Sequence, residues 1–211
     1  MTNDYATLSE LQASMPGSGI SSTDYESLLT DLLTRASRAI DRFTKRAPGA
    51  YAVTSSDEQT RYYDGSGSAT QYLDEMAAAP SYVGVSEAGG VASTDYTTYP
   101  STDYFIEPVN APYEGMPYTH LVLDQLNGGK ALWYSLSHSV KVTAAFAYAL
   151  STAIPDEIVQ ATIIQAARWF KRGQQAFQDT GAIAELGQLT YTQSLDPEVK
   201  AIIEHYRRTV L

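Results

Sequence analysis

The stretch TDYESLLTDLLTRASRAIDRFTKR, residues 23–46, predicts the clearest helix in the chain. Thr23 and Glu26 have the spacing of a capping box, in which each side chain bonds the backbone amide of the other residue. The apolar residues that follow recur at spacings of three and four, so they share one face of a helix with ~3.6 residues per turn. They are Leu29, Leu32, Leu33, Ala36, Ile40 and Phe43. Such a stripe must be buried, so the rest of the domain has to supply a partner surface.

A row of basic residues runs beside this apolar stripe. Arg35, Arg38, Arg42 and Lys45 are spaced three, four and three apart. One interpretation is a solvated face whose cations suit the negative C-terminal end of the helix dipole. The other is a row of cations that faces a neighbouring subunit or DNA phosphates.

The overall charge bounds the possible functions. The chain has 211 residues, a net charge of −10 and a pI of about 4.6. Tight binding of duplex DNA usually requires a basic surface, so this balance argues against it but not against a passage through which DNA slides. The absence of cysteine excludes disulfides and a Cys-ligated zinc site. We expect no signal peptide, and no apolar run of ~18 residues predicts a membrane span.

The charge and the tyrosines are concentrated in the middle of the chain. Residues 51–150 carry eleven acidic and three basic residues, and twelve of the sixteen tyrosines. This shift in composition predicts three parts: N-terminal helices in residues 1–50, a Tyr-rich acidic β region in 51–150, and C-terminal helices in 151–211.

The helices of the two ends have recognisable starts. Thr7 and Glu10 form a second capping-box pattern, which opens a short helix before Pro16. Pro155 begins a helix that we expect to extend to about Phe177 and to pack on residues 23–46. A final amphipathic helix follows Asp196, with Val199, Ile202, Ile203 and Tyr206 on its apolar face. We expect residues 196–211 to dock on a partner.

The middle region reads as short antiparallel strands separated by turns. The predicted strands are residues 59–64, 70–73, 81–86, 103–107, 119–124 and 140–144. The first two flank GSGS and are predicted to form a hairpin, while residues 88–100 are predicted to be a long loop. The predicted fold class is therefore α+β: an α-helical bundle from the N- and C-terminal thirds, with an inserted small antiparallel β-sandwich or barrel.

Catalytic motifs are absent from the sequence. His120, His138 and His205 have no metal-binding spacing, and no nucleophile elbow, P-loop or dinucleotide fingerprint occurs. The acidic residues of the middle region leave a carboxylate-dependent hydrolase or a calcium site open as alternatives; they are Asp57, Glu58, Asp64, Asp74, Glu75, Asp95, Asp103 and Glu107. Its tyrosines suit either a carbohydrate-binding platform or a protein interface. We predict no enzyme activity, no cofactor and no metal.

The order of several segments resembles a known family. YATLSELQ is followed by LLTRASRAIDRFTKRA, TRYYDG, DYFIEPVNAP, YTHLVLD, VKVTAAFAYA and IPDEIVQATIIQAARWFKR, over most of residues 5–172. This set resembles the head–tail connector (head-completion or adaptor) family of tailed double-stranded-DNA bacteriophages and gene-transfer particles. Such proteins often read VxVTGxxG before the last long helix, whereas this chain has alanines at 144, 145 and 147.

The resemblance implies a structural role in a virion. It implies a homo-oligomeric ring, commonly of twelve subunits, that docks on the portal protein and is made in the host cytoplasm. It also implies that genomic DNA passes through the lumen without tight binding, and that a neck or tail-completion protein docks on the ring, with no membrane involved. On this view Arg35, Arg38, Arg42 and Lys45, with the apolar face of the final helix, are the candidate interface with the portal or the adjacent subunit. The alternative is a carbohydrate- or surface-binding β module with helical flanks.

Overall fold

The computed structural model describes residues 3–15, 25–90, 95–177 and 195–208, with only the backbone for 174–177. The chain divides into two compact units. Met1–Gly49 and Ile154–Leu211 form one, which we call the helical unit, and Ala50–Ala153 form the other, the β unit. The predicted α+β class, with antiparallel sheets, is confirmed.

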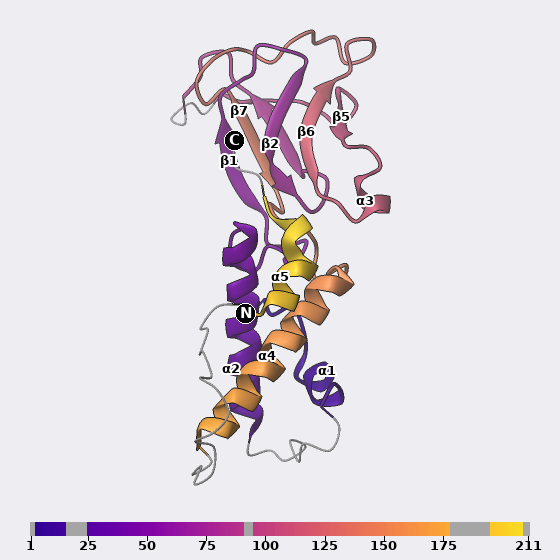
Figure 1. Cartoon of the computed structure of the whole chain (residues 1–211). Helices are drawn as coiled ribbons and strands as arrows, with labels where there is room; N and C mark the ends of the chain where they lie inside the picture. Colours follow the sequence, from indigo (N-terminus) through magenta and orange to yellow (C-terminus); the bar gives the residue numbers. More distant parts are fainter. Residues whose placement is uncertain (1–2, 16–24, 91–94, 178–194, 209–211) are drawn as a thin grey trace. The chain divides into compact units, whose positions relative to one another are not determined.

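The helical unit is built from both ends of the chain. Its main helices, shown in Figure 1, are α1 (Leu8–Ala13), α2 (Glu26–Thr44), α4 (Asp156–Phe177) and α5 (Pro197–Ile203), and a 3₁₀ turn, η2 (Glu204–Tyr206), follows α5. α2 packs on α4, and α4 also contacts α5. None of the helices in the described ranges combines the length and the apolar composition that a membrane crossing requires.

The predicted packing of residues 23–46 on the helix that follows Pro155 is confirmed. Leu29, Leu33 and Phe170 are buried in one cluster, and Ile163 and Ala167 pack against it. The apolar stripes of α2 and α4 therefore cover each other, as two amphipathic helices with no other large apolar partner should.

The helix ends agree only in part with the sequence. The Thr7–Glu10 capping box forms as predicted. Thr23 lies outside the described residues, and α2 begins at Glu26 after Tyr25, whose side chain makes no capping hydrogen bond. α2 ends at Thr44, and the cap residue that follows, Lys45, adopts the left-handed conformation with φ 58°.

The final helix packs within its own chain. Val199 and Ile203 are fully buried, and Tyr206 is buried beside them. The backbone amide of Asp196 donates to Oε1 of Gln165 on α4 at 2.9 Å, and the Tyr206 hydroxyl donates to Glu157 at 2.9 Å. α5 therefore packs on α4 within the monomer, and the expected contact of residues 196–211 with a portal or a neighbouring subunit stays a prediction.

The β unit contains two antiparallel sheets. Its strands are β1 (Gln59–Tyr63), β2 (Thr70–Met76), β3 (Tyr82–Val85), β4 (Thr97–Thr98), β5 (Tyr104–Glu107), β6 (Tyr118–Leu123) and β7 (Val140–Ala144), and α3 (Ala111–Glu114) lies between β5 and β6. One sheet has the order β1-β7-β3-β4. The other has the order β2-β6-β5 (Figure 1). Both contribute to one buried cluster that includes Leu121, Val142 and Trp133. The described strands form no closed barrel, so that alternative is wrong.

Two local predictions in this region are wrong. β1 and β2 do not form a hairpin, because β1 pairs with β7 and β2 with β6, in different sheets. The GSGS segment instead leads from one sheet to the other, and the buried Gln71 bonds it there: its Oε1 accepts from the Ser66 amide at 2.9 Å and its Nε2 donates to the Asp64 carbonyl at 3.2 Å. The predicted loop at residues 88–100 contains the short strand β4, which pairs with β3.

Candidate functional site

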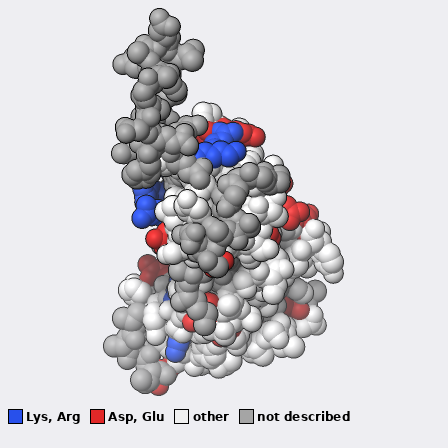
Figure 2. Space-filling view, turned by 90° about the horizontal axis from the view of Figure 1, so that it is seen from below, with Lys and Arg blue, Asp and Glu red and all other residues white. Residues whose placement is uncertain are grey.

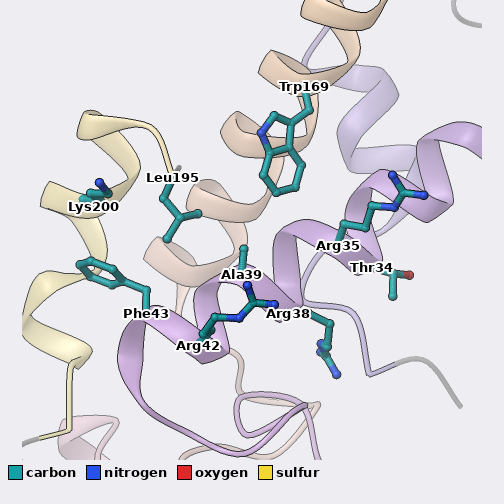
Figure 3. Close-up of a pocket in the computed structure, with 9 residues that line it drawn as sticks. All are labelled: Thr34, Arg35, Arg38, Ala39, Arg42, Phe43, Trp169, Leu195 and Lys200. Carbon is teal, nitrogen blue, oxygen red and sulfur yellow. The ribbon is translucent and has the colours of Figure 1, made fainter. Parts of the chain in front are cut away.

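A pocket of about 520 Å³ lies on the helical unit, where α2, α4 and α5 come together (Figure 3). Phe43, Leu195 and Lys200 lie toward one end of it and Arg35 toward the other, while Trp169 points from α4 toward α2. The residues that line it are Thr34, Arg35, Arg38, Ala39, Arg42, Phe43, Trp169, Leu195 and Lys200. We call this pocket the basic groove.

The basic groove has an apolar floor. Phe43 and Trp169 are half-buried, Leu195 is buried, and Ala39 lies between them on α2. Phe43 belongs to the edge of the apolar stripe of α2, and Trp169 lies beside the Phe170 stripe of α4. Each therefore keeps part of its ring outside the core that the two helices share. Aromatic side chains held half-exposed in a concave surface are typical of binding sites.

Three cations surround this floor without acidic partners. Arg35 and Arg42 are exposed and Lys200 is half-buried. None of the three makes an ion pair with a residue that the structure describes. The lining contains neither Asp nor Glu, so its positive charge is left for a ligand or a partner to neutralise.

Arg38, from the same basic row, has a different role. Its Nε lies 3.1 Å from Oδ2 of Asp41, its Nη2 donates to the Asn3 carbonyl at 2.7 Å, and its guanidinium lies over the Tyr5 ring. Arg38 therefore fastens the N-terminal segment to α2. Lys45 is exposed at the C-terminal end of α2 and does not line the basic groove.

The Asp41 carboxylate is buried under this N-terminal segment. Burial raises its pKa, although the Tyr5 hydroxyl, the Arg38 guanidinium and the Gly49 amide act in the opposite direction. All these partners belong to the chain itself, so Asp41 is a structural group of the helical unit.

The acidic residues considered as catalytic have structural partners in several cases. Asp64 accepts from the amide of His138 at 2.8 Å and from the hydroxyl of Ser137 at 3.0 Å. Asp74 pairs with Arg61 at 2.8 Å. Within the described residues, no group of three or more His, Cys, Asp or Glu side chains could hold a metal ion.

The surface seen in Figure 2 has no continuous basic band among its described residues. Lys and Arg side chains reach this face in small separate groups, with Asp and Glu beside them. A protein that follows a duplex backbone presents a basic patch or stripe instead. The described residues on this face therefore form no extended nucleic-acid surface.

Sequence reasoning found part of this site. It identified Arg35, Arg38 and Arg42 from their spacing, and the structure brings all three to the groove lining. It missed Trp169, Leu195 and Lys200, which join the lining only after α4 and α5 fold onto α2. The position of Trp169, three residues after the buried Ala166 and beside Phe170, was the one available signal that it flanks a packed face.

No protein-family model matches the sequence, and no curated protein matches it. Solved structures, however, contain chains of similar fold. A chain in the neck of an empty gene transfer agent (GTA) particle, computed with C6 symmetry, is 16% identical with a TM-score of 0.55, and the match covers 96% of this chain and 89% of that one. A chain in the neck of the native GTA particle, computed with C12 symmetry, is 16% identical with a TM-score of 0.50, and the match covers 96% of this chain and 88% of that one. A chain in the virion of the native particle is 18% identical, with a TM-score of 0.51 and coverage of 96% and 89%.

These similarities extend over nearly the whole chain and so include both of its units. At 16–18% identity they establish the fold. The resemblance to head–tail connectors that the sequence predicts is therefore confirmed at the level of the fold.

Proposed function

We propose that the protein is a structural connector in the neck of a virion or gene-transfer particle. In this role it forms a homo-oligomeric ring below the portal protein, extends the DNA channel and provides the platform on which a neck or tail-completion protein docks. Its helical unit acts as a bundle built from both ends of the chain, with the β unit as a small antiparallel sandwich inserted into it. The observation that carries the proposal is the fold similarity to neck chains over 96% of this chain.

Symmetry supports the ring. The similar necks were computed with C6 and C12 symmetry, and cyclic symmetry relates identical subunits around a closed ring. Twelve copies of this chain carry about −120 formal charges, from −10 each, which suits a channel that must not hold DNA. Phosphate contacts repeated around a ring add affinity through counterion release and slow the passage of DNA.

The basic groove supports an interface role. Its cations Arg35, Arg42 and Lys200, which pair with no acidic residue in the described part of the chain, and its half-buried aromatic rings fit an acidic protein partner better than they fit the DNA lumen. That partner is either the portal or an adjacent subunit. Arg35 and Arg42 remain in the proposed interface, and Lys200 and Trp169 join it. Arg38 leaves it, because its guanidinium already holds Asp41 and Asn3.

The test is the assembly state of the full-length protein, measured by mass photometry and negative-stain electron microscopy, alone and with its cognate portal ring. We expect closed rings in at least one of these conditions. We also expect no measurable binding to duplex DNA at ~150 mM salt, where screening weakens exposed charge contacts. Monomers in both conditions, or tight salt-sensitive DNA binding, contradict the proposal.

One observation favours the alternative of a carbohydrate- or surface-binding β module. Tyr72 is 71% exposed and its ring lies against His120, with a centroid separation of 5.3 Å, on the three-stranded sheet. Exposed rings of this kind can stack on sugars. A glycan array probed with the full chain and with Tyr72→Ala decides this point: binding that Tyr72→Ala abolishes favours the module, and no binding removes it.

A further inference from the structure

A projecting segment of the β unit has surface properties opposite to those of the basic groove. We call residues 107–116, from the last residue of β5 to the turn before β6, the knob. Tyr113 is 90% exposed, Val109 63% and Met116 45%. Apolar side chains that are held in solvent together mark an interaction surface more often than side chains exposed singly.

The knob is folded and not loose. The Ala111 amide donates to the Pro108 carbonyl at 3.0 Å, the Glu114 amide to the Asn110 carbonyl at 3.2 Å, and the Met116 amide to the Ala111 carbonyl at 3.0 Å. Ala111 is fully buried and anchors the segment. An ordered backbone therefore holds Tyr113 in solvent, so the segment loses less conformational entropy when it binds a partner.

The knob and the stretch of sequence around it contain acidic residues and no cation. Residues 62–129 contain nine acidic residues and neither Lys nor Arg. Within the knob, Glu114 is exposed and Glu107 is half-buried. A surface with this composition repels a like copy of itself and attracts a cationic one.

We propose that the knob of one copy of the chain docks into the basic groove of the next copy. This inference rests on the proposed ring and names its subunit contact. Tyr113 packs on the floor made by Phe43, Trp169 and Leu195, while the carboxylates face the groove cations. The two surfaces are different, so the contact is head-to-tail, the type that closes into a ring when the rotation between copies is suitable.

The small size of the contact sets its strength. One tyrosine buries ~150–250 Å², and stable interfaces bury ~1,200–2,000 Å² in total. A single knob therefore holds a neighbour weakly, and the ring gains persistence because every copy makes the contact on both sides.

Disulfide trapping tests the contact directly, because the chain has no native cysteine. Full-length Val109→Cys, which leaves Tyr113 in place, and full-length Ala39→Cys are purified separately, mixed and mildly oxidised. We expect a disulfide-linked dimer of the mixed pair to form about tenfold faster than with the control Leu126→Cys plus Ala39→Cys, because docking raises the effective thiol concentration. Leu126 is 94% exposed in the same unit but lies outside the knob. Equal rates for the two pairs, or no dimer, overturn the proposal.

A second pair tests a different occupant of the basic groove. Tyr191 belongs to residues 178–194 of the same chain, which precede Leu195 in the groove lining. Rapid formation of an internal disulfide in the double variant Tyr191→Cys/Ala39→Cys, with no trapping through residue 109, shows that the chain fills its own groove. That result overturns docking of the knob.

Charge reversal separates recognition from misfolding. Glu114→Lys in the Val109→Cys partner, or Arg42→Glu in the Ala39→Cys partner, should each slow trapping by about tenfold. The two reversals combined should restore the rate to within about threefold of the original pair, because opposite charges face each other again. A damaged fold would not be rescued in this way, so failure of the rescue contradicts the pairing.

The ring assay distinguishes this inference from the proposed function. If Tyr113→Ala assembles rings as the wild type does, the knob contact is wrong while the connector role stands. If the wild type forms no ring alone or on the portal, yet residues 109 and 39 are trapped selectively, the contact is correct and the connector role is wrong.

Discussion

The two units of this protein differ in the apolar and charged side chains that they expose. Among the described residues of the helical unit, the exposed large apolar side chains are Tyr25 and Leu28. In the β unit, Tyr72, Phe105 and Tyr113 are all more than half exposed. The β unit also carries most of the negative charge, whereas the basic groove belongs to the helical unit. The helical unit thus has a concave cationic surface, and the β unit has exposed acidic and aromatic side chains. A head-to-tail assembly brings two different surfaces of this kind together.

The strand register explains how the β unit exposes its aromatic residues. Tyr72 lies opposite His120, which lies opposite Glu107 on the next strand. Gln71 and Leu121, the neighbours of Tyr72 and His120, point to the other face and are buried. Successive side chains of a strand alternate between faces, so the sheet contributes to the core with one face while the other presents an aromatic ring to solvent.

The largest predicted effect follows from removing the final helix. Truncation after Ser194 removes Leu195, Val199, Ile203 and Tyr206, and each fully buried aliphatic side chain contributes ~1.5–3 kcal/mol. We expect the helical unit to lose several kcal/mol in its free energy of unfolding, measured by urea denaturation. Removal of residues 209–211 alone is the matched control and should have little effect. A truncated monomer of unchanged stability would restore α5 as a free docking segment.

The next effect concerns the α2–α4 core. Leu33 is 2% exposed, so Leu33→Ala should lower the free energy of unfolding by ~2–5 kcal/mol through lost burial and the cavity that remains. Leu28→Ala, on the same helix but 48% exposed, should change it by less than ~0.5 kcal/mol. Similar values for the two variants would show that this stripe does not carry the core of the helical unit.

The helices of the helical unit could be predicted from the sequence because the spacing of apolar residues within a helix is a local pattern. The spacing of Leu29, Leu33 and Phe170 specifies a buried face wherever a partner helix exists. Most strands were also located, but their pairing was not, because β1 pairs with β7 across 77–85 residues and β2 pairs with β6 across 42–52 residues. A two-residue strand such as Thr97–Thr98 has no periodicity to detect. The basic groove could not be predicted in full for the same reason, because tertiary packing brings Trp169 and Lys200 to the pocket that Arg42 also lines.

A third prediction concerns the connection between the two sheets. Gly65 has no space for a side chain, since a Cβ there would lie 1.7 Å from the Tyr134 carbonyl oxygen. A backbone carbonyl cannot move aside as a flexible side chain can. Gly65→Ala should therefore lower the free energy of unfolding by at least the ~1–3 kcal/mol typical of overpacking. Thermal unfolding measures this loss. Gly129→Ala is the comparison: its φ is +64° but nothing lies within 4 Å, so only the left-handed strain of ~1–2 kcal/mol applies. A smaller effect at Gly65 than at Gly129 would contradict the described turn.

The smallest predicted effect is a difference in the pH dependence of stability between Asp64 in the β unit and Asp41 in the helical unit. The His138 amide and the Ser137 hydroxyl hold the pKa of Asp64 below the ordinary aspartate value of 3.8, whereas burial raises the pKa of Asp41 above it. Asp64 therefore contributes stability that is fully present above pH 3.8 and is lost as the pH falls from there through its lower folded pKa. Asp41 behaves oppositely: its charged form is disfavoured in the folded state, so acidification through its raised pKa relieves a destabilising contribution. Carboxyl-carbon NMR titration should place Asp64 below 3.8 and Asp41 above it. The stability difference between wild type and Asp64→Asn should shrink below pH 3.8, and a difference that stays constant down to pH 2 would show that the turn bonds of Asp64 do not depend on its charge.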